Sequence, residues 1–326
     1  MLKVERVVEL IEKFKNLKIA VVGDMMIDSY LLGDVTRISP EAPVPVVNVN
    51  KERFVLGGAA NVSNNLRNLN SQVITYGVIG DDENGQKLIK KLEETGIEVS
   101  GLVIDSERPT IIKTRILAHN NQLLRIDWEK NEVINERIQK DIIDRLEKNI
   151  KNIEAIILSD YNKGVLSEYV SKKIIEIARK NNKIITVDPK PKNFINYVGA
   201  TAITPNKKEI LEYLGLNSFT DESDIENKAM KIKEDLDLKY LLLTRSEEGV
   251  SICSENYNKV STMAKEVYDV TGAGDTLISV FTLALAAGAT SLEAAKIGNI
   301  AAGIVVGKIG TATTTKEEII KFYEDM

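Results

Sequence analysis

The sequence is poor in the two side chains that most often build metal and nucleophile sites. It contains a single cysteine, Cys253, and a single histidine, His119, in 326 residues. A lone cysteine excludes an intramolecular disulfide and a cysteine-based zinc cluster, and it suits a reducing compartment. A lone histidine argues against a histidine-paired catalytic triad and against a site with several histidine ligands. Any general base is therefore expected to be Asp or Glu.

Aromatic residues, positive charge and long apolar runs are also scarce. Aromatic residues make up 5% of the chain, and the formal net charge is −5. Few stacking platforms and no basic excess argue against nucleic acid and anionic membranes as partners. No apolar run approaches the roughly 18 residues of a membrane span, and the N-terminus lacks an apolar signal-peptide core. We expect a cytoplasmic protein in which local basic residues contact any phosphorylated ligand.

Apolar strands alternate with amphipathic helices along most of the chain. The alternation predicts a mostly parallel sheet covered on both faces, and the uniform composition predicts one α/β domain over residues 1–326. Ligands of such sheets bind beyond the carboxyl ends of the strands. The predicted strands are 18–22, 72–79, 155–158, 183–187, 200–204, 240–244 and 259–267. The predicted helices are 1–16, 62–69, 84–95, 133–150, 167–180, a stretch from 206, one ending near 235, 273–287, 291–306 and 315–324.

Residues 30–50 and 110–128 break this pattern. Pro40, Pro43 and Pro45 lie close together in the first stretch, and proline suits edges and loops because it lacks an amide donor. The second stretch has two β-rich runs, 110–117 and 122–128, on either side of a turn. We expect these two stretches to form a small β excursion outside the central sheet.

The heptapeptide 269–275, Asp-Val-Thr-Gly-Ala-Gly-Asp, precedes a long apolar helix. Gly272, Ala273 and Gly274 are predicted at the helix start, where unpaired amides and the positive end of the helix dipole attract a phosphate. Asp275 then falls in the first turn, where it could accept a proton from an attacking hydroxyl. The alternative is a flexible loop followed by an Asp that favours the helix dipole.

A second small-residue motif, Gly-Gly-Ala-Ala-Asn, occupies residues 57–61. A polyol could lie against Gly57 and Gly58 while Asn61 bonds a hydroxyl, although the motif alone favours a tight loop with close helix packing. Asp24 and Asp28, after the first strand, could also bond sugar hydroxyls, or either could be a turn residue, and Asp24 is the weaker functional case. The chain has neither a Walker-type phosphate loop nor a Gly-x-Gly-x-x-Gly dinucleotide fingerprint after the first strand.

Two further motifs follow predicted strands. Residues 204–209, Thr-Pro-Asn-Lys-Lys-Glu, fit a helix capping box, but they also place Asn206 and Glu209 where Mg²⁺ and phosphates would sit. Residues 244–249, Thr-Arg-Ser-Glu-Glu-Gly, could border a nucleotide phosphate or form an ordinary turn.

Together, in order and spacing, these four motifs resemble the ribokinase-like (PfkB) sugar kinases across nearly the whole chain. The resemblance implies a three-layer α/β/α domain with a β-sheet lid often shared in a homodimer, ATP as the phosphoryl donor, Mg²⁺, and Asp275 as the base. It implies Mg²⁺ contact, directly or through water, at Glu209. The nucleotide-binding residues that it implies are Asn206, Lys207, Lys208, Glu209, Thr244, Arg245, Gly249 and Asn299.

A narrower resemblance is to the D-glycero-β-D-manno-heptose 7-phosphate kinases of ADP-heptose and lipopolysaccharide core synthesis. It lies in residues 37–46, 123–127, 158–164, 266–270 and 303–311. It implies transfer of the γ-phosphoryl of ATP to the anomeric C1 hydroxyl of the heptose 7-phosphate. Because the chain ends soon after the last predicted helix and has no His-x-Gly-His motif, it resembles the free-standing kinase more than forms fused to an adenylyltransferase.

A phosphorylated acceptor needs cations in the site. Arg37, Arg115, Arg125, Lys163 and Lys190 are candidates to hold its phosphate, although basic residues on strands and loops commonly just face water. Two other functions remain open: a kinase for ribose, fructose or another ketose, and a catalytically silent nucleotide- or sugar-binding regulator. The intact sequence 272–275 argues against the regulator, because a pure binder needs no base.

Overall fold

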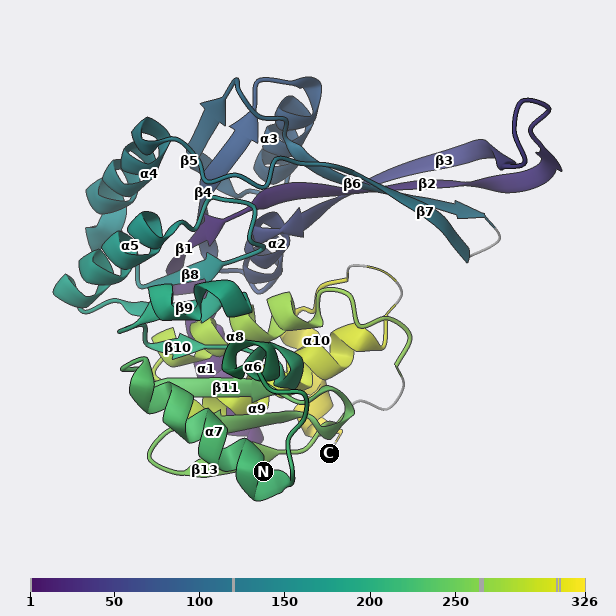
Figure 1. Ribbon diagram of the computed structural model, residues 1–326. Coiled ribbons are helices and arrows are strands. Elements are labelled where there is room, and N and C mark those ends of the chain that lie inside the picture. Colours follow the sequence, from purple (N-terminus) through teal and green to yellow (C-terminus); the bar gives the residue numbers. More distant parts are fainter. Residues whose placement is uncertain (1, 119–120, 264–266, 309, 311, 326) are drawn as a thin grey trace.

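The protein is described by a computed structural model that covers residues 2–118, 121–263, 267–308, 310 and 312–325. Its centre is a nine-stranded sheet in the order β13-β12-β11-β10-β9-β8-β1-β4-β5 (Figure 1). From β11 to β5 in this order, neighbouring strands pair in parallel, whereas β12 and β13 are antiparallel additions at one edge. The strands are β1 (Lys18–Gly23), β4 (Gln72–Gly80), β5 (Glu98–Asp105), β8 (Ala155–Ser159), β9 (Ile184–Asp188), β10 (Ala202–Ile203), β11 (Tyr240–Thr244), β12 (Val250–Cys253) and β13 (Tyr257–Val260).

Helices cover both faces of this sheet, so that two separate apolar cores form. One core is built with α1 (Val4–Lys13), α2 (Ala59–Asn68), α3 (Glu83–Glu94), α8 (Ala273–Ala286), α9 (Ser291–Val306) and α10 (Lys316–Glu324). The other is built with α4 (Glu136–Asn149), α5 (Glu168–Lys180), α6 (Lys207–Leu214) and α7 (Glu222–Asp235). Short 3-10 helices are η1 (Phe14–Asn16), η2 (Ile150–Asn152), η3 (Pro191–Tyr197) and η4 (Ser246–Glu248).

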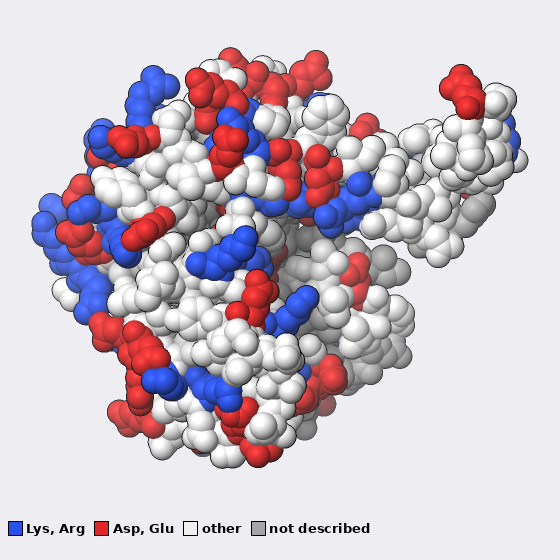
Figure 2. Space-filling model, viewed as in Figure 1, with Lys and Arg blue, Asp and Glu red and all other residues white. Residues whose placement is uncertain are grey.

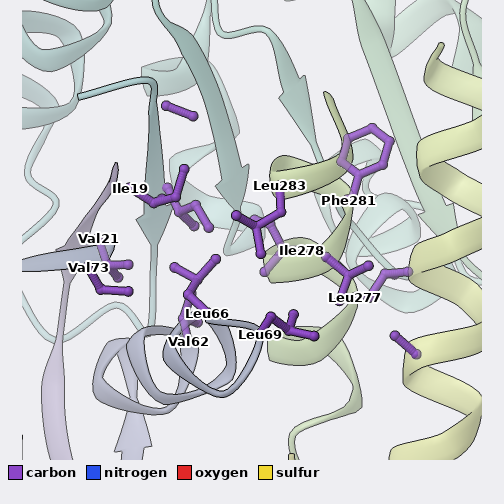
Figure 3. Close-up of a cluster of buried hydrophobic side chains, with 14 of the residues drawn as sticks. Ile19, Val21, Val62, Leu66, Leu69, Val73, Leu277, Ile278, Phe281 and Leu283 are labelled. Carbon is purple, nitrogen blue, oxygen red and sulfur yellow. The ribbon is translucent and has the colours of Figure 1, made fainter. Parts of the chain in front are cut away.

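Helix α8 lies in the middle of the first core because it carries no charged side chain after its first turn. Leu277, Ile278 and Phe281 from α8 belong to the same buried cluster as Leu66 of α2 and Val73 of β4 (Figure 3). Burial of large apolar side chains is the main favourable term in folding. The packing therefore fixes α2 and α8 against the sheet, and with them the residues at the starts of both helices.

A second, four-stranded sheet has the order β3-β2-β6-β7 and extends away from the body as a long arm (Figure 1). It is formed by β2 (Met25–Ile38), β3 (Pro45–Gly58), β6 (Ile111–Ala118) and β7 (Asn121–Trp128). Strand β2 pairs with β3 from Met25 opposite Gly58, near the body, to Ile38 opposite Pro45, at the far end. The surface is hollowed beneath this arm, where it meets the body (Figure 2). The predicted α/β fold with a small second sheet is confirmed.

Some elements differ from the sequence prediction. Strand β5 was not expected, and α2 begins at Ala59, three residues before the predicted start. The strand predicted over 259–267 is instead the short β13, and residues 261–263 are not in a strand. Residues 119–120 of the predicted turn and 264–266 of that strand lie outside the described residues. Among the described residues, no helix combines the length and apolarity that crossing a bilayer requires.

Candidate active site

The predicted chemistry gathers where β1, β8 and β9 end, because these strands are neighbours in a parallel sheet and finish at the same edge. Asp24 follows β1, Asp160 and Tyr161 follow β8, and Asp188 closes β9. Asp275, in the first turn of α8, lies at the same edge, because its carboxylate accepts hydrogen bonds from Tyr161 and from Asn61 of α2. The site is thus assembled from segments that are far apart in the sequence.

Asp275 is buried, with 6% of its surface exposed, and its carboxylate has two hydrogen-bond donors. The Asn61 side-chain amide donates to Oδ2 at 2.7 Å, and the Tyr161 hydroxyl donates to Oδ1 at 3.0 Å. The next residue of α8 ties the two helices together a second time, because the Thr276 hydroxyl donates a hydrogen bond to Asn65 Oδ1 of α2 at 2.7 Å. The carboxylate is therefore held from both sides and not merely placed at a helix end.

Burial raises the pKa of the Asp275 carboxyl to about 6, while the bonds from Asn61 and Tyr161 act against this rise. Nearby Asp28 raises the pKa further, and Lys190 lowers it. Since low-dielectric surroundings disfavour the charged form of a carboxyl, the direction follows from the burial alone. A carboxyl with a pKa of about 6 is ionised at neutral pH and can still take up a proton, as a general base must.

The backbone before α8 has the geometry expected of a helix-start anion site. Gly272 is the N-cap residue with φ 83°, a left-handed conformation that favours glycine. A Cβ on Gly274 would meet no protein atom within 4 Å, so its exposed backbone borders open space. The Ala273 amide already donates to the Val270 carbonyl at 3.2 Å. Of the three amides predicted to bind phosphate, Ala273's is therefore engaged within the turn.

The residues predicted to hold the sugar lie beside Asp275. Asn61 Oδ1 is buried and has no hydrogen-bond partner among the described residues, an arrangement that calls for a donor from outside the chain. Asp28 on β2 is 7% exposed and pairs with Arg115 of β6. Gly57 leaves room for Asp28, because a Cβ there would lie 2.5 Å from the Asp28 carboxylate. Gly58 starts α2 with φ 54°.

One face of the arm continues this polar surface. Strand pairing places Asp28 beside Lys113, Arg115 beside Arg125, and Lys113 beside Asp127, which puts all five side chains on the same face. Arg125 is 51% exposed at its side chain and pairs with Asp127 at 2.9 Å. Arg115 and Arg125 lie directly opposite each other, and their mutual repulsion is offset by their pairs with Asp28 and Asp127. They are therefore two neighbouring cations on the face of the arm that carries Asp28.

Lys190, Glu209 and Asp188 form the other side of the site. Lys190 Nζ lies 3.0 Å from Glu209 Oε1 and 5.8 Å from the centre of the Tyr161 ring. Glu209 Oε2 accepts from the Asn206 amide at 2.9 Å, and Asn206 Oδ1 accepts from the Glu209 amide at 2.8 Å. The capping box is therefore present, and it leaves the Glu209 carboxylate facing Lys190. Burial raises the pKa of the Asp188 carboxyl to about 8.

The residues after β11 make a tight structural cluster. The buried Arg245 guanidinium donates to Glu222, Glu248, Ser251 and Tyr257. Gly249 has φ 92°, and a Cβ there would lie 2.3 Å from the Val260 carbonyl oxygen. The contacts shown here for Arg245 and Gly249 are therefore those of a folded turn. Their predicted role in nucleotide binding remains a prediction.

The other predicted nucleotide residues surround this cluster. The Thr244 amide donates to the Pro205 carbonyl at 2.8 Å. Lys207 forms an ion pair with Glu248, and Lys208 is exposed. Asn299 on α9 donates from its side chain to the Ser261 carbonyl at 2.8 Å, so it supports the segment after β13.

Arg37 lies far along the arm from Asp28, and its predicted role in substrate binding remains a prediction. It is exposed and pairs with Val46 near the far end of the β2–β3 arm. Nine residues of strand separate it from Asp28, which is about 30 Å at roughly 3.3 Å per residue. The sequence motif around Arg37 gave no sign that the strand would extend so far.

Sequence reasoning assigned no role to Tyr161 and only a weak one to Asp24. Asp24 is fully buried, and it accepts bonds from the backbone amides of Tyr161, Lys163 and Val165 at 3.0, 3.0 and 3.2 Å. The available signal was position, because both residues directly follow central parallel strands. Lys163 itself pairs with Glu129 at 2.6 Å, so this phosphate candidate is already neutralised.

Comparison with known proteins identifies the family to which the chain belongs. The sequence profile of the pfkB family carbohydrate kinases matches residues 16–318. A protein of Aliarcobacter butzleri (strain RM4018) named Bifunctional protein HldE is 48% identical over 308 residues, a match that covers 94% of this chain and 64% of that protein. The chain thus spans just under two thirds of the length of this relative.

Solved structures share the fold at lower identity. The ribokinase of Arabidopsis thaliana, complexed with ribose and ATP, superposes with a TM-score of 0.74 and 17% identity, covering 94% of this chain and 99% of that one. Phosphofructokinase-2 from Escherichia coli, in complex with potassium, gives a TM-score of 0.77 with 20% identity, covering 95% and 98%. Both comparisons bear on the fold alone.

The family match makes the chain a phosphotransferase, and the buried Asp275 carboxylate lies at the strand ends, where parallel α/β sheets bind their ligands. The chain belongs to the pfkB family of carbohydrate kinases, and it is therefore a sugar kinase.

The burial of Asp275 predicts a pH-dependent stability change in Asp275→Asn. Its carboxyl pKa is raised from 3.8 to about 6, so the folded state carries no penalty below pH 4, and the penalty is complete above about pH 6. Removing the charge should raise the free energy of unfolding by up to about 3 kcal/mol at pH 8 and by less than about 1 kcal/mol at pH 4. Urea denaturation at both pH values measures this. The exposed Asp144→Asn is the control, and an Asp275→Asn variant that is no more stable at pH 8 would contradict the burial argument.

Proposed function

We propose that this kinase transfers the γ-phosphoryl group of ATP to the anomeric C1 hydroxyl of D-glycero-D-manno-heptose 7-phosphate, giving the 1,7-bisphosphate. The observation that carries the proposal is the Asp275 carboxylate, buried at the start of α8 and held by Asn61 and Tyr161. The heptose as acceptor rests on the resemblance of the lid and strand-end motifs to heptose kinases and on the 48% identity to a protein named Bifunctional protein HldE.

The chemistry needs one proton acceptor and one acceptor for developing negative charge. As the C1 oxygen forms its bond to the γ-phosphorus, its proton passes to Asp275 and the bond to the β-phosphate oxygen breaks, which releases ADP. The helix-start amides near Gly272 and Gly274 lie where charge develops on the transferring group. Loss of such an oriented donor typically costs on the order of 100- to 1000-fold in rate.

ATP as the donor is supported by the family and by the neighbour that was solved with ribose and ATP. Asn206, Lys207, Lys208, Thr244, Arg245, Gly249 and Asn299 remain the proposed nucleotide residues. Arg245 is fully engaged by Glu222 and Glu248, so we assign it to the shape of the nucleotide-side turn, and we do not assign it direct phosphate contact.

The carboxylate chemistry at Glu209 fits Mg²⁺ held through water. Mg²⁺ in kinase sites keeps several waters and takes few protein carboxylates alongside substrate phosphates. Both Glu209 oxygens already have donors, Lys190 and the Asn206 amide, so direct ligation would displace one of them. When bound, the ion would neutralise charge on the nucleotide phosphates. No group of three or more His, Cys, Asp or Glu side chains among the described residues forms a ready-made metal cage.

Arg115 and Arg125 are the cations that we assign to the acceptor's own phosphate. They share the sheet face that carries Asp28, and Asp28 lies close enough to Asp275 to affect its pKa. The sugar's C1 end would lie at Asp275 and Asn61, with its phosphate toward the arm. Lys190 stays on the nucleotide side through its bond to Glu209.

The opposite face of the arm supports a homodimer. Leu124, Ile126 and Trp128 alternate along β7, so they share one face, with exposed fractions of 55%, 39% and 62%. Ile38 and Val44 near the far end are 62% and 51% exposed. Exposed apolar strands commonly mark a protein interface. We propose that the arms of two copies pack together and form the lid, which excludes water from phosphoryl transfer. Such pairing would also give Arg37 a neighbouring copy to contact.

Asp275→Asn should bind ATP nearly normally and lose most turnover, because the amide keeps the shape of the side chain but cannot accept the proton. Steady-state kinetics with heptose 7-phosphate, together with nucleotide titration calorimetry, measures both properties. Turnover close to wild type in this folded variant would sink the assignment of Asp275 as the base.

The acceptor's phosphate should contribute strongly to specificity. Removing a charged, hydrogen-bonded group costs about 2–5 kcal/mol, so kcat/KM for heptose 7-phosphate should exceed that for free heptose by roughly 30- to several-thousand-fold. Arg125→Gln should shrink this ratio, whereas Arg137→Gln, an exposed change on α4, should not. Equal constants for the two heptoses, or a clear preference for ribose or fructose, would remove the heptose assignment and leave the sugar kinase in place.

Leu124→Glu should weaken the proposed dimer, because it places a charge in the apolar face of β7. Sedimentation velocity at micromolar concentration should show a dimer for the wild type and a shift toward monomer for the variant. Val133→Glu, at a position that is 60% exposed outside the arm, is the matched control. A fully active wild-type monomer at that concentration would refute the shared lid.

A further inference from the structure

The segment after β8 is anchored by a buried carboxylate, and it holds the Tyr161 hydroxyl against the carboxylate of Asp275. The Asp24 carboxylate, fully buried after β1, accepts from the backbone amides of Tyr161, Lys163 and Val165. Three hydrogen bonds from backbone amides to one buried carboxylate hold the backbone of this irregular segment in place. The Asp24 carboxylate thus holds the backbone of the segment that carries Tyr161.

Tyr161 completes the coordination of Asp275. Its hydroxyl meets Oδ1 at 3.0 Å, while Asn61 meets Oδ2 at 2.7 Å. One donor on each oxygen fixes the plane of the carboxylate, and a single donor would leave it free to rotate. The Tyr161 ring is itself held between this contact and the Lys190 ammonium, 5.8 Å from its centre.

We propose that Tyr161 is a positioning residue that keeps the Asp275 carboxylate ionised and oriented toward the acceptor hydroxyl, with Asp24 as the anchor of its segment. This rests on the proposed function, in which Asp275 is the base. The role deepens that function, because it makes the segment after β8 part of the base's machinery.

Charged groups near Asp275 shift the pKa of its carboxyl, and the hydrogen bond from Tyr161 acts on the same pKa. Asp28 from β2 and Asp188 at the end of β9 disfavour a second negative charge, and Lys190 favours it. Asn61 and Tyr161 are the neutral donors that act against burial. Burial also raises the pKa of the Tyr161 hydroxyl well above its usual value, so it remains a protonated donor at neutral pH.

Tyr161→Phe keeps the ring and removes only the hydroxyl. The acid limb of kcat/KM for the sugar should move to higher pH by about one unit. The rate should therefore fall roughly tenfold at pH 5.5 and return to within about threefold of wild type at pH 9, with the KM for ATP unchanged. Phosphates of the substrates titrate equally with every variant, so the difference between profiles is the measurement. Tyr323→Phe, which removes a buried hydroxyl on α10, should leave the profile as in wild type.

An unchanged acid limb in Tyr161→Phe, or a loss that is equal at every pH, would overturn the positioning role. Thermal melting at pH 8 verifies that the variant is folded, and Asp24→Asn, which weakens the anchor, should move the limb in the same direction. If Asp275→Asn is inactive and the Tyr161→Phe profile is that of wild type, the positioning role alone fails. If Asp275→Asn keeps its turnover, the base assignment itself fails.

Discussion

The site depends on keeping one carboxylate charged where burial opposes it. Asp275 lies at the start of an almost wholly apolar helix, out of contact with most solvent, and near Asp28 and Asp188. A charge in such surroundings is unfavourable unless donors and cations meet it. Asn61, Tyr161 and Lys190 supply them, and each comes from a different element. The elements around Asp275 are accordingly held in register by specific bonds, such as those between α2 and α8.

The two sheets divide the work. The parallel sheet brings the ends of β1, β8 and β9 to one edge, and its buried faces fix α2 and α8 there. The four-stranded arm then extends from β1 through β2, so that Asp28 lies near its base and Arg115 pairs with Asp28. The polar face of the arm continues the site, while its other face exposes Leu124 and Trp128. We propose that the polar face contacts a phosphorylated sugar and that the apolar face contacts a second copy of the chain.

Sequence patterns predicted much of this, because most elements have clear local signals. The apolar run after Asp275 predicted α8, and the capping box predicted the start of α6 at Asn206 and Glu209. Residues 57–61 were placed at a helix start, where α2 begins.

The features that could not be predicted from the sequence depend on contacts between residues that are distant in the chain. Tyr161 lies in a segment without periodicity, and its partner Asp275 is 114 residues away. Arg245 fits a nucleotide motif, but its guanidinium is paired with Glu222 of α7. Arg37 lies in a proline-rich stretch whose composition predicted exposure and could not give the length of the arm. Pairing of charges in three dimensions decides such cases, and one-dimensional patterns do not record it.

We propose that this kinase phosphorylates the anomeric oxygen of a heptose that already carries a phosphate. Phosphorus–proton correlation NMR of the product formed from ATP and D-glycero-D-manno-heptose 7-phosphate tests it directly. We expect a new phosphorus resonance coupled to the anomeric proton, alongside the retained 7-phosphate resonance and ADP. A new phosphate on any other carbon, or no product while ribose or fructose is phosphorylated, would contradict it.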